Sequence, residues 1–126
     1  AALATDDLLM QAAQVRAEEM AATNLYSHTR PNGKSFFTVT DVPYMAENIH
    51  CIWDSPDSPM AVDVVALWSR SEGHRKNMLN GRVDSIGIGI AAGIDENGVG
   101  CSYCVQLFLY EGNRITWVDT PMCSIP

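Results

Sequence analysis

The chain has little positive charge. Its 126 residues contain 8 Lys and Arg against 15 Asp and Glu, a formal net charge of -7, and the basic residues form no run. Proteins that bind phosphate backbones or anionic membranes gather lysine and arginine on one surface. We therefore expect no nucleic-acid partner.

Long hydrophobic runs are also missing. No apolar stretch approaches the roughly 20 residues that span a bilayer, so we expect no transmembrane segment. The N-terminal sequence "AALATDDLLM" lacks the basic flank of a signal peptide, which predicts that a leader was removed or never present. The hydrophobic content of 47% is enough for one domain, residues 1–126, with a single core.

Cysteines are few. Cys51, Cys101, Cys104 and Cys123 are compatible with up to two disulfides in any of three connectivities. Cys101 and Cys104 have the Cys-x-x-Cys spacing of redox and zinc sites, but they lie in "CSYCVQLFLY", a predicted strand in which positions three apart face opposite sides. A zinc knuckle would need a second close pair. Structural thiols or disulfides are therefore favoured over metal or redox chemistry.

The first half of the chain predicts helix and loop. A helix is expected over residues 6–22, with Thr5 as its N-cap and the charges of Asp6 and Asp7 suited to a helix N-terminus. The turn sequence "RPNGKS" predicts a loop after His28. Within residues 38–58 only "YMAENIHC" is expected to be ordered, as one short turn of helix.

A second helical region is expected at residues 58–80. Ser58 and Pro59 are typical of a helix start, and the helix continues through "MAVDVVALWSRS". Gly73 breaks it, and "HRKNMLN" predicts a second short helix that ends at Asn80 and Gly81.

The last third has the alternation of strands. In "SIGIGIAAG" isoleucines alternate with glycines, which leaves one bare face over which another element can lie closely. Asn97 and Gly98 predict a hairpin into a strand over residues 101–110, and "EGNR" predicts a turn into "ITWV". Helices followed by a meander predict an α+β domain whose antiparallel sheet is covered by helices.

Several side chains are candidates for chemistry, and each also has a structural interpretation. A histidine near a turn, such as His28 or His74, is usually hydrogen-bonded in place, and His50 has no neighbour that indicates function. Glu47 can hold backbone N–H groups in a loop. Tyr103 can pack in the core with its hydroxyl near the surface.

The order of the segments favours function for some of them. "LYSHTRPNGKSFFTV", "AENI", "ALWSRSEGHRKNMLN", "SIGIGI" and "YCVQLF" follow one another as in the bacterial branch of the CAP superfamily of cysteine-rich secretory, antigen 5 and pathogenesis-related 1 proteins, which the chain resembles from about Asp7 to Phe108. The resemblance implies an α-β-α sandwich with a central antiparallel sheet flanked by helices.

The resemblance also implies a cleft. His28 matches the family's first cleft histidine and Glu47 of "AENI" its first glutamate, while Ser71 and Tyr103 stand where eukaryotic members have the second glutamate and the second histidine. His74 matches a histidine typical of the bacterial branch. We expect His28, Glu47 and His74 to line the cleft, with Ser71 and Tyr103 as neighbours.

Such a set permits three kinds of chemistry. His28 and His74 could bind a divalent metal, Zn²⁺ or Mg²⁺, with a position left for water. Without metal, the groups could act as general acid and base, or hydrogen-bond a polar ligand. A serine-hydrolase role for Ser71 is disfavoured, because no oxyanion hole or nucleophile elbow is recognisable.

The family implies a secreted module, so we expect an extracellular or envelope location and a small-molecule, lipid or peptide ligand. A binding or interaction module is the favoured interpretation. The alternative is a hydrolase of peptide or cell-wall amide bonds that positions a metal or a water. Whether the chain is an enzyme stays open at this point.

Two departures from the family pattern stand at the ends of the chain. Bacterial members usually carry a helix with an Asn-x-x-Arg motif ahead of the one expected here from Asp6, and this chain starts after it. Residues 111–126, "EGNRITWVDTPMCSIP", extend beyond the usual last strand. We expect Cys123 of this extension to pair with Cys101 or Cys104.

Overall fold

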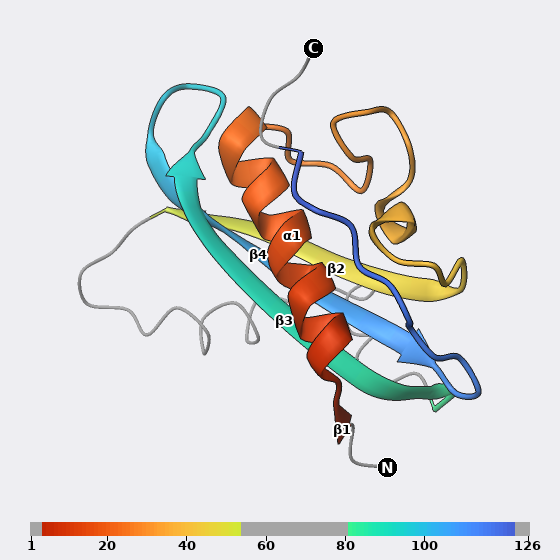
Figure 1. The fold of residues 1–126 in the computed structure, drawn as a ribbon. Helices are drawn as coiled ribbons and strands as arrows, with labels where there is room; N and C mark the ends of the chain where they lie inside the picture. Colours follow the sequence, from red (N-terminus) through yellow and green to blue (C-terminus); the bar gives the residue numbers. More distant parts are fainter. Residues whose placement is uncertain (1–3, 54–80, 123–126) are drawn as a thin grey trace.

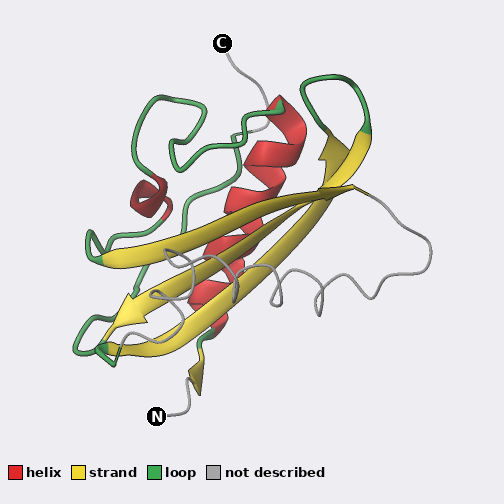
Figure 2. Cartoon of the chain, turned by 180° about the vertical axis from the view of Figure 1, so that it is seen from behind, coloured by secondary structure: helices red, strands yellow, loops and turns green. Residues whose placement is uncertain are grey.

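A computed structural model describes residues 4–53 and 81–122 (Figure 1). One long helix lies across one face of a twisted sheet, and the view from behind shows the strands in front of it (Figure 2). The elements are, in chain order, β1 (Ala4–Thr5), α1 (Asp7–Thr23), the 3₁₀ helix η1 (Phe36–Val39), β2 (Met45–Trp53), β3 (Val83–Ile94) and β4 (Gly100–Tyr110). The α+β class is confirmed.

The sheet is mixed. Its order is β1-β3-β4-β2, in which the three long strands are antiparallel and the two-residue β1 pairs parallel with β3. The central antiparallel sheet is as predicted, and the short β1 adds a parallel pair at its edge, because the chain pairs with β3 just before it turns into α1. "ITWV" forms no strand in the described part of the chain, only a bridge between Thr40 and Val118. The helices expected at residues 58–80 lie outside the described residues.

Helix α1 confirms the predicted helix, but its N-cap is one residue later than expected. The side chain of Asp6 accepts a hydrogen bond from Leu9 N at 2.9 Å, while Thr5 belongs to β1. The helix ends at Asn24, whose left-handed backbone (φ 58°) asparagine tolerates better than most residues.

The bare glycine face of β3 receives α1, as predicted. A Cβ atom added at Gly87 would meet the backbone of Leu9 and Met10, and one at Gly89 would meet the backbone of Ala13 and Gln14. The two backbones are therefore as close as glycine allows. This approach buries the alanine-rich side of α1 in the core.

Side chains of α1 also cover part of the β3 edge. Gln14 accepts a hydrogen bond from Ile90 N and donates one to Ile90 O, both at 3.0 Å, and Met10 Sδ accepts one from Ile88 N at 3.1 Å. These contacts take the place of a neighbouring strand and protect backbone groups that would otherwise invite edge-to-edge pairing.

The prediction of a helical turn at "YMAENIHC" is wrong, because this segment forms β2. The strand pairs with β4 along its whole length, from Met45 opposite Leu109 to Trp53 opposite Cys101. Its middle is buried on both faces and so lacks the alternation that identifies a half-exposed strand. Across the pair, Asn48 Nδ2 donates to Gln106 Oε1 at 3.0 Å, so Gln106 has a structural role.

The C-terminal segment runs back beside α1 (Figure 1). Asp41 accepts hydrogen bonds from the backbone and side chain of Thr116, and Asp119 N donates to Val39 O at 2.8 Å. Residues 113–122 are thereby tied to the loop around η1. No helix in the described ranges has the length and hydrophobicity to cross a bilayer.

The expected disulfides are not confirmed. Cys51, Cys101 and Cys104 are free thiols, and Cys123 lies outside the described residues. Burial is the main cause that raises the pKa of Cys51 to about 12 and that of Cys104 to about 11. Both groups are therefore neutral thiols at physiological pH.

We expect Cys51 and Cys104 to resist iodoacetamide in the native protein at pH 8, because the thiolate is the reactive form. Labelling should increase as the pH rises toward these pKa values, and it should be fast at both positions in denaturant. Peptide mapping after timed labelling would measure each site. Rapid labelling of either cysteine in the native state at pH 8 would contradict the assignment.

Candidate functional site

His28 and Glu47 form a direct contact. His28 lies in the loop after α1 and Glu47 on β2, and the His28 Nδ1 atom is 2.8 Å from Glu47 Oε1. The side chain of His28 is 56% exposed, whereas that of Glu47 is fully buried. The two residues that the family resemblance placed in a cleft therefore meet at the protein surface, with the imidazole outermost.

Arg16 of α1 holds Glu47 from the other side. Its Nε atom donates to Glu47 Oε2 at 2.7 Å and its Nη2 atom to Glu47 Oε1 at 3.1 Å. The Nη2 atom also donates to the carbonyl oxygen of Ser27, the residue before the histidine, at 2.6 Å. A bidentate contact of this kind sets both the position and the orientation of the carboxylate. Arg16 thus positions the glutamate and the loop that carries His28.

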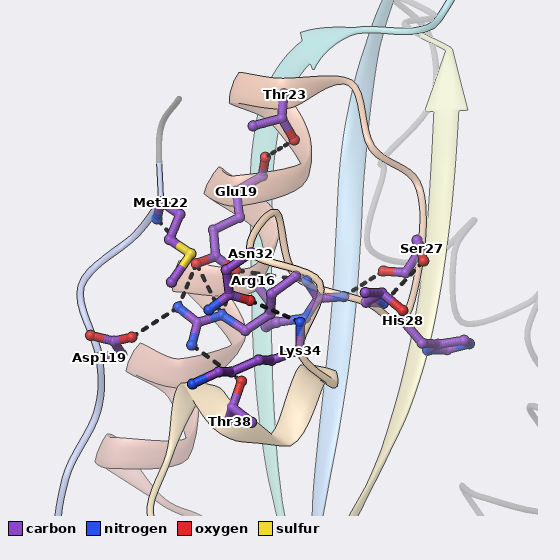
Figure 3. Close-up of polar contacts among 12 residues, drawn as sticks. Arg16, Glu19, Thr23, Ser27, His28, Asn32, Lys34, Thr38, Asp119 and Met122 are labelled. Atoms are coloured by element: carbon purple, nitrogen blue, oxygen red, sulfur yellow. Dashed lines mark hydrogen bonds and ion pairs between the residues drawn. The ribbon is translucent and has the colours of Figure 1, made fainter. Parts of the chain in front are cut away.

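The buried ion pairs continue beyond Arg16 (Figure 3). Glu19 lies 3.7 Å from Arg16 Nη1 and accepts hydrogen bonds from Arg30, the closest at 2.6 Å. Arg30 also contacts Asp119 at 3.1 Å, and Met122 N donates to Glu19 at 3.1 Å. Although burial lowers the pKa of Arg30, its hydrogen bonds and charge interactions with Glu19 and Asp119 raise it overall. The network joins the His28 loop to the C-terminal segment.

Three charged residues of the site, Arg16, Glu19 and Arg30, were not predicted from the sequence. A signal was available for the first two, because they occupy the same side of α1 as the buried Ala12 and Met20. Charged residues at core positions of an amphipathic helix indicate buried partners. Nothing in the sequence shows which partners these are.

The contact with Glu47 determines which nitrogen of His28 faces outward. A carboxylate only accepts hydrogen bonds, so the His28 Nδ1 atom carries a hydrogen. In the neutral imidazole the Nε2 atom then has a free lone pair, which can accept a hydrogen bond, take up a proton or bind a metal. Phe36 lies edge-on to the ring at a centroid distance of 6.1 Å.

Tyr103 lies further along the sheet. It is opposite Cys51, which follows Glu47 by four residues on β2, about 13 Å at the usual rise of a strand. Its hydroxyl donates to Ile94 O at 2.7 Å. Tyr26 lies between Glu47 and Tyr103. Its hydroxyl donates to the carbonyl oxygen of Ile49 on β2, and its ring is 6.5 Å from that of Tyr103. Burial is the main cause that raises the pKa of Tyr26, and the charge of Glu47 contributes.

The other expected site residues are in part outside the described ranges. Ser71 and His74 belong to residues 54–80. His50 lies on β2, and burial lowers its pKa.

No group of three potential metal ligands occurs in the ranges 4–53 and 81–122. Both oxygens of Glu47 accept hydrogen bonds from Arg16 or His28, which makes Glu47 a support for the histidine.

Comparison with known proteins agrees with this fold and with the motif order. The model of the CAP family, described as the cysteine-rich secretory protein family, matches residues 1–108. The chain belongs to this family. It is 33% identical over 92 residues to the uncharacterised protein YkwD of Bacillus subtilis, a match that covers 69% of this chain and 34% of YkwD.

Two solved structures share the fold. One is an extracellular protein containing an SCP domain from Bacillus anthracis, with a TM-score of 0.65 and 24% identity over 88% of this chain and 34% of that protein. The other is an outer surface protein of Borrelia burgdorferi, with a TM-score of 0.59 and 19% identity over 86% of this chain and 77% of that protein. The chain spans about a third of the length of the two Bacillus proteins.

Proposed function

We propose that the chain is a ligand-binding domain that acts outside the cytoplasm, and that His28 Nε2 contacts a small ligand, a peptide or an envelope component. The observation that carries this proposal is the 2.8 Å contact between His28 Nδ1 and Glu47 Oε1 beneath a half-exposed ring. The carboxylate is buried and held by Arg16, so the imidazole is the group that a ligand reaches first.

The arrangement suits recognition. A buried carboxylate that receives three hydrogen bonds holds the ring in one orientation before any ligand arrives. Preorganisation of this kind reduces the entropy lost on binding. We include Ser71, His74 and Tyr103 in the proposed cleft on the family resemblance. The extracellular location is supported by the descriptions of the two structural relatives, one as extracellular and one as an outer surface protein.

The same contact supports a second candidate, a hydrolase of peptide or cell-wall amide bonds. A carboxylate that orients Nδ1–H makes Nε2 a better general base, and His28 with His74 would provide two ligands for Zn²⁺. Calorimetric titration of Zn²⁺ and Mg²⁺ into the wild type and a His28→Ala, His74→Ala variant tests the metal. Micromolar binding that the variant loses would favour the hydrolase.

We expect His28→Ala to weaken the binding of a recognised ligand roughly tenfold or more, the effect of removing one hydrogen bond to a charged or strongly polar group. Soluble muropeptides, an unstructured peptide and palmitate are suitable first probes, with binding measured by calorimetry. Thr29→Ala is the matched control, because Thr29 is also exposed in the same loop and its side chain has no hydrogen bond to Glu47.

Equal affinity of the wild type and His28→Ala for a probe that binds would contradict the role of His28. Mass spectrometry of the muropeptides after incubation separates the two candidates. Cleavage that is lost in His28→Ala would select the hydrolase. Glu47→Gln is a poor first variant, because it removes the charge of the carboxylate that accepts two hydrogen bonds from the buried Arg16 and leaves Arg16 with Glu19 at 3.7 Å. Any loss of binding could then come from loss of the fold.

A further inference from the structure

A pocket of about 490 Å³ lies between the end of β2, the hairpin that joins β3 to β4, and the segment after α1. Its volume is within the range of small-molecule sites, ~300–1,000 Å³. Tyr26, Trp53 and Tyr103 provide three aromatic side chains, and Asp95 and Glu96 of the hairpin provide two acidic ones. Neither His28 nor Glu47 is among the described residues that line it.

The aromatic rings are held in place by hydrogen bonds at their polar ends. Trp53 Nε1 donates to Asp95 Oδ2 at 2.8 Å, and the hydroxyl of Tyr26 donates to Ile49 O at 3.0 Å. The hydroxyl of Tyr103 likewise bonds to a backbone carbonyl. Trp53 is 56% exposed and Tyr26 48% exposed. The rings of Trp53 and Tyr26 are therefore the surfaces that the pocket offers to a ligand, because Tyr103 is buried behind them, and the polar ends of all three are already bonded.

The charge of the pocket is negative. No lysine or arginine occurs among the described residues that line it. The hydrogen bond from Trp53 is the main cause that lowers the pKa of Asp95, so its carboxyl group is ionised at neutral pH. Burial lowers the pKa of His50, the histidine of the pocket, which is therefore neutral under the same conditions. Aromatic faces with nearby carboxylates attract organic cations.

A metal ion fits this pocket less well. Hard cations need several oxygen ligands, and the hydroxyl groups of Tyr26 and Tyr103 are already bonded to backbone carbonyls. Asp95 Oδ1 already accepts hydrogen bonds from Asn97 N and Val99 N, both at 2.8 Å, and Oδ2 accepts the one from Trp53. The carboxylate of Asp95 thus shapes the hairpin and, as part of the pocket lining, contributes its negative charge to the pocket.

We propose that this pocket binds a small organic cation, with an alkylammonium group against the rings of Trp53 and Tyr26 and beside the carboxylates of Asp95 and Glu96. This site goes beyond the function proposed for His28. The two sites share Tyr103, but His28 and Glu47 are not among the described residues that line the pocket, so variants of Trp53 and Glu96 test it separately from His28.

The test is calorimetric titration of the whole chain with choline, with n-butylammonium and with 3,3-dimethylbutan-1-ol, the neutral analogue that has the shape of choline. We expect at least one of the cations to bind roughly tenfold tighter than the neutral alcohol. The tighter of the two cations shows whether a quaternary or a primary ammonium group is preferred. Equal binding of the alcohol, or no binding of either cation, would overturn the proposal.

Two pairs of variants locate the site. Trp53→Ala should weaken cation binding roughly tenfold, while Trp117→Ala, which removes a similarly exposed tryptophan outside the pocket, should leave it unchanged. Glu96→Gln should weaken it roughly threefold at low salt, and Glu111→Gln should not. Trp53→Phe keeps a ring and should retain most of the affinity, which separates loss of the ring from loss of folding. Full affinity in Trp53→Ala would overturn the assignment.

Discussion

Arg16→Met is expected to destabilise the protein by about 3–5 kcal/mol, the usual cost of removing one partner from a buried ion pair. Arg16 and Glu47 are both fully buried, and Glu19 also lies against the guanidinium. The variant would leave Glu47 with the partly exposed His28 and Glu19 with Arg30. Urea unfolding followed by circular dichroism measures the change in the free energy of unfolding.

Arg114→Met is the matched control, since Arg114 is exposed and the same substitution there should change stability by less than about 0.5 kcal/mol. The loop after α1 should also become less ordered in Arg16→Met, because Arg16 Nη2 bonds to Ser27 O. Hydrogen exchange at residues 27–30 would detect this. A variant as stable as the wild type would mean that the network contributes nothing to folding.

Gly89→Ala is expected to destabilise the protein by about 2–3 kcal/mol, in the upper part of the range for overpacked cores. The added methyl group would meet the backbone of Ala13 and Gln14, which no side-chain rotation can move aside. Helix α1 would have to shift away from β3. The bonds between Gln14 and Ile90 would then lengthen and leave this part of the strand edge less protected.

The same substitution at Gly81 provides the control. Gly81 has open space where the Cβ atom would stand and no positive φ, so Gly81→Ala should be neutral or slightly stabilising. Thermal unfolding of both variants, with size-exclusion chromatography to detect association, measures the difference. Equal stability of Gly81→Ala and Gly89→Ala would mean that α1 and β3 are not as close as described.

The buried network joins helix α1, near the start of the described chain, to residues 113–122 near its end. Glu19 binds Arg30 of the His28 loop and the backbone of Met122, and Arg30 also contacts Asp119. Residues 113–122, in the C-terminal extension, therefore help to hold the arginines behind the candidate site. Hydrogen bonds within such a network strengthen one another and limit the movement of the residues that they join. Arg16 Nη1 is the exception, because it has no hydrogen-bond partner among the described residues and lies 3.7 Å from Glu19.

The candidate site was predicted in part. The motif order identified His28 and Glu47, and the structure shows that they touch. The position of Arg16 on the buried side of α1 was a signal that was not used, and the sequence does not show that its partner is Glu47. The aromatic pocket was missed for a similar reason, since Tyr26, Trp53 and Asp95 come together from three separate segments.

The local features of the fold follow from short sequence patterns. Helix propensity set α1, and the alternation of glycine with isoleucine set β3 and the face that receives the helix. The sequence "DENG" set the hairpin into β4, where Gly98 has a positive φ. Each depends on residues close together in the chain, so the pattern is visible without the fold.

Other features depend on partners that are distant in the chain and could not be predicted from local patterns. Strand β2 exists because β4 pairs with it, although its residues look irregular alone. Buried Arg16, Glu19, Arg30 and Glu47 are stable only because each meets an opposite charge from another segment or turn. The free energy of a buried charge depends on what surrounds it, and packing alone sets those surroundings.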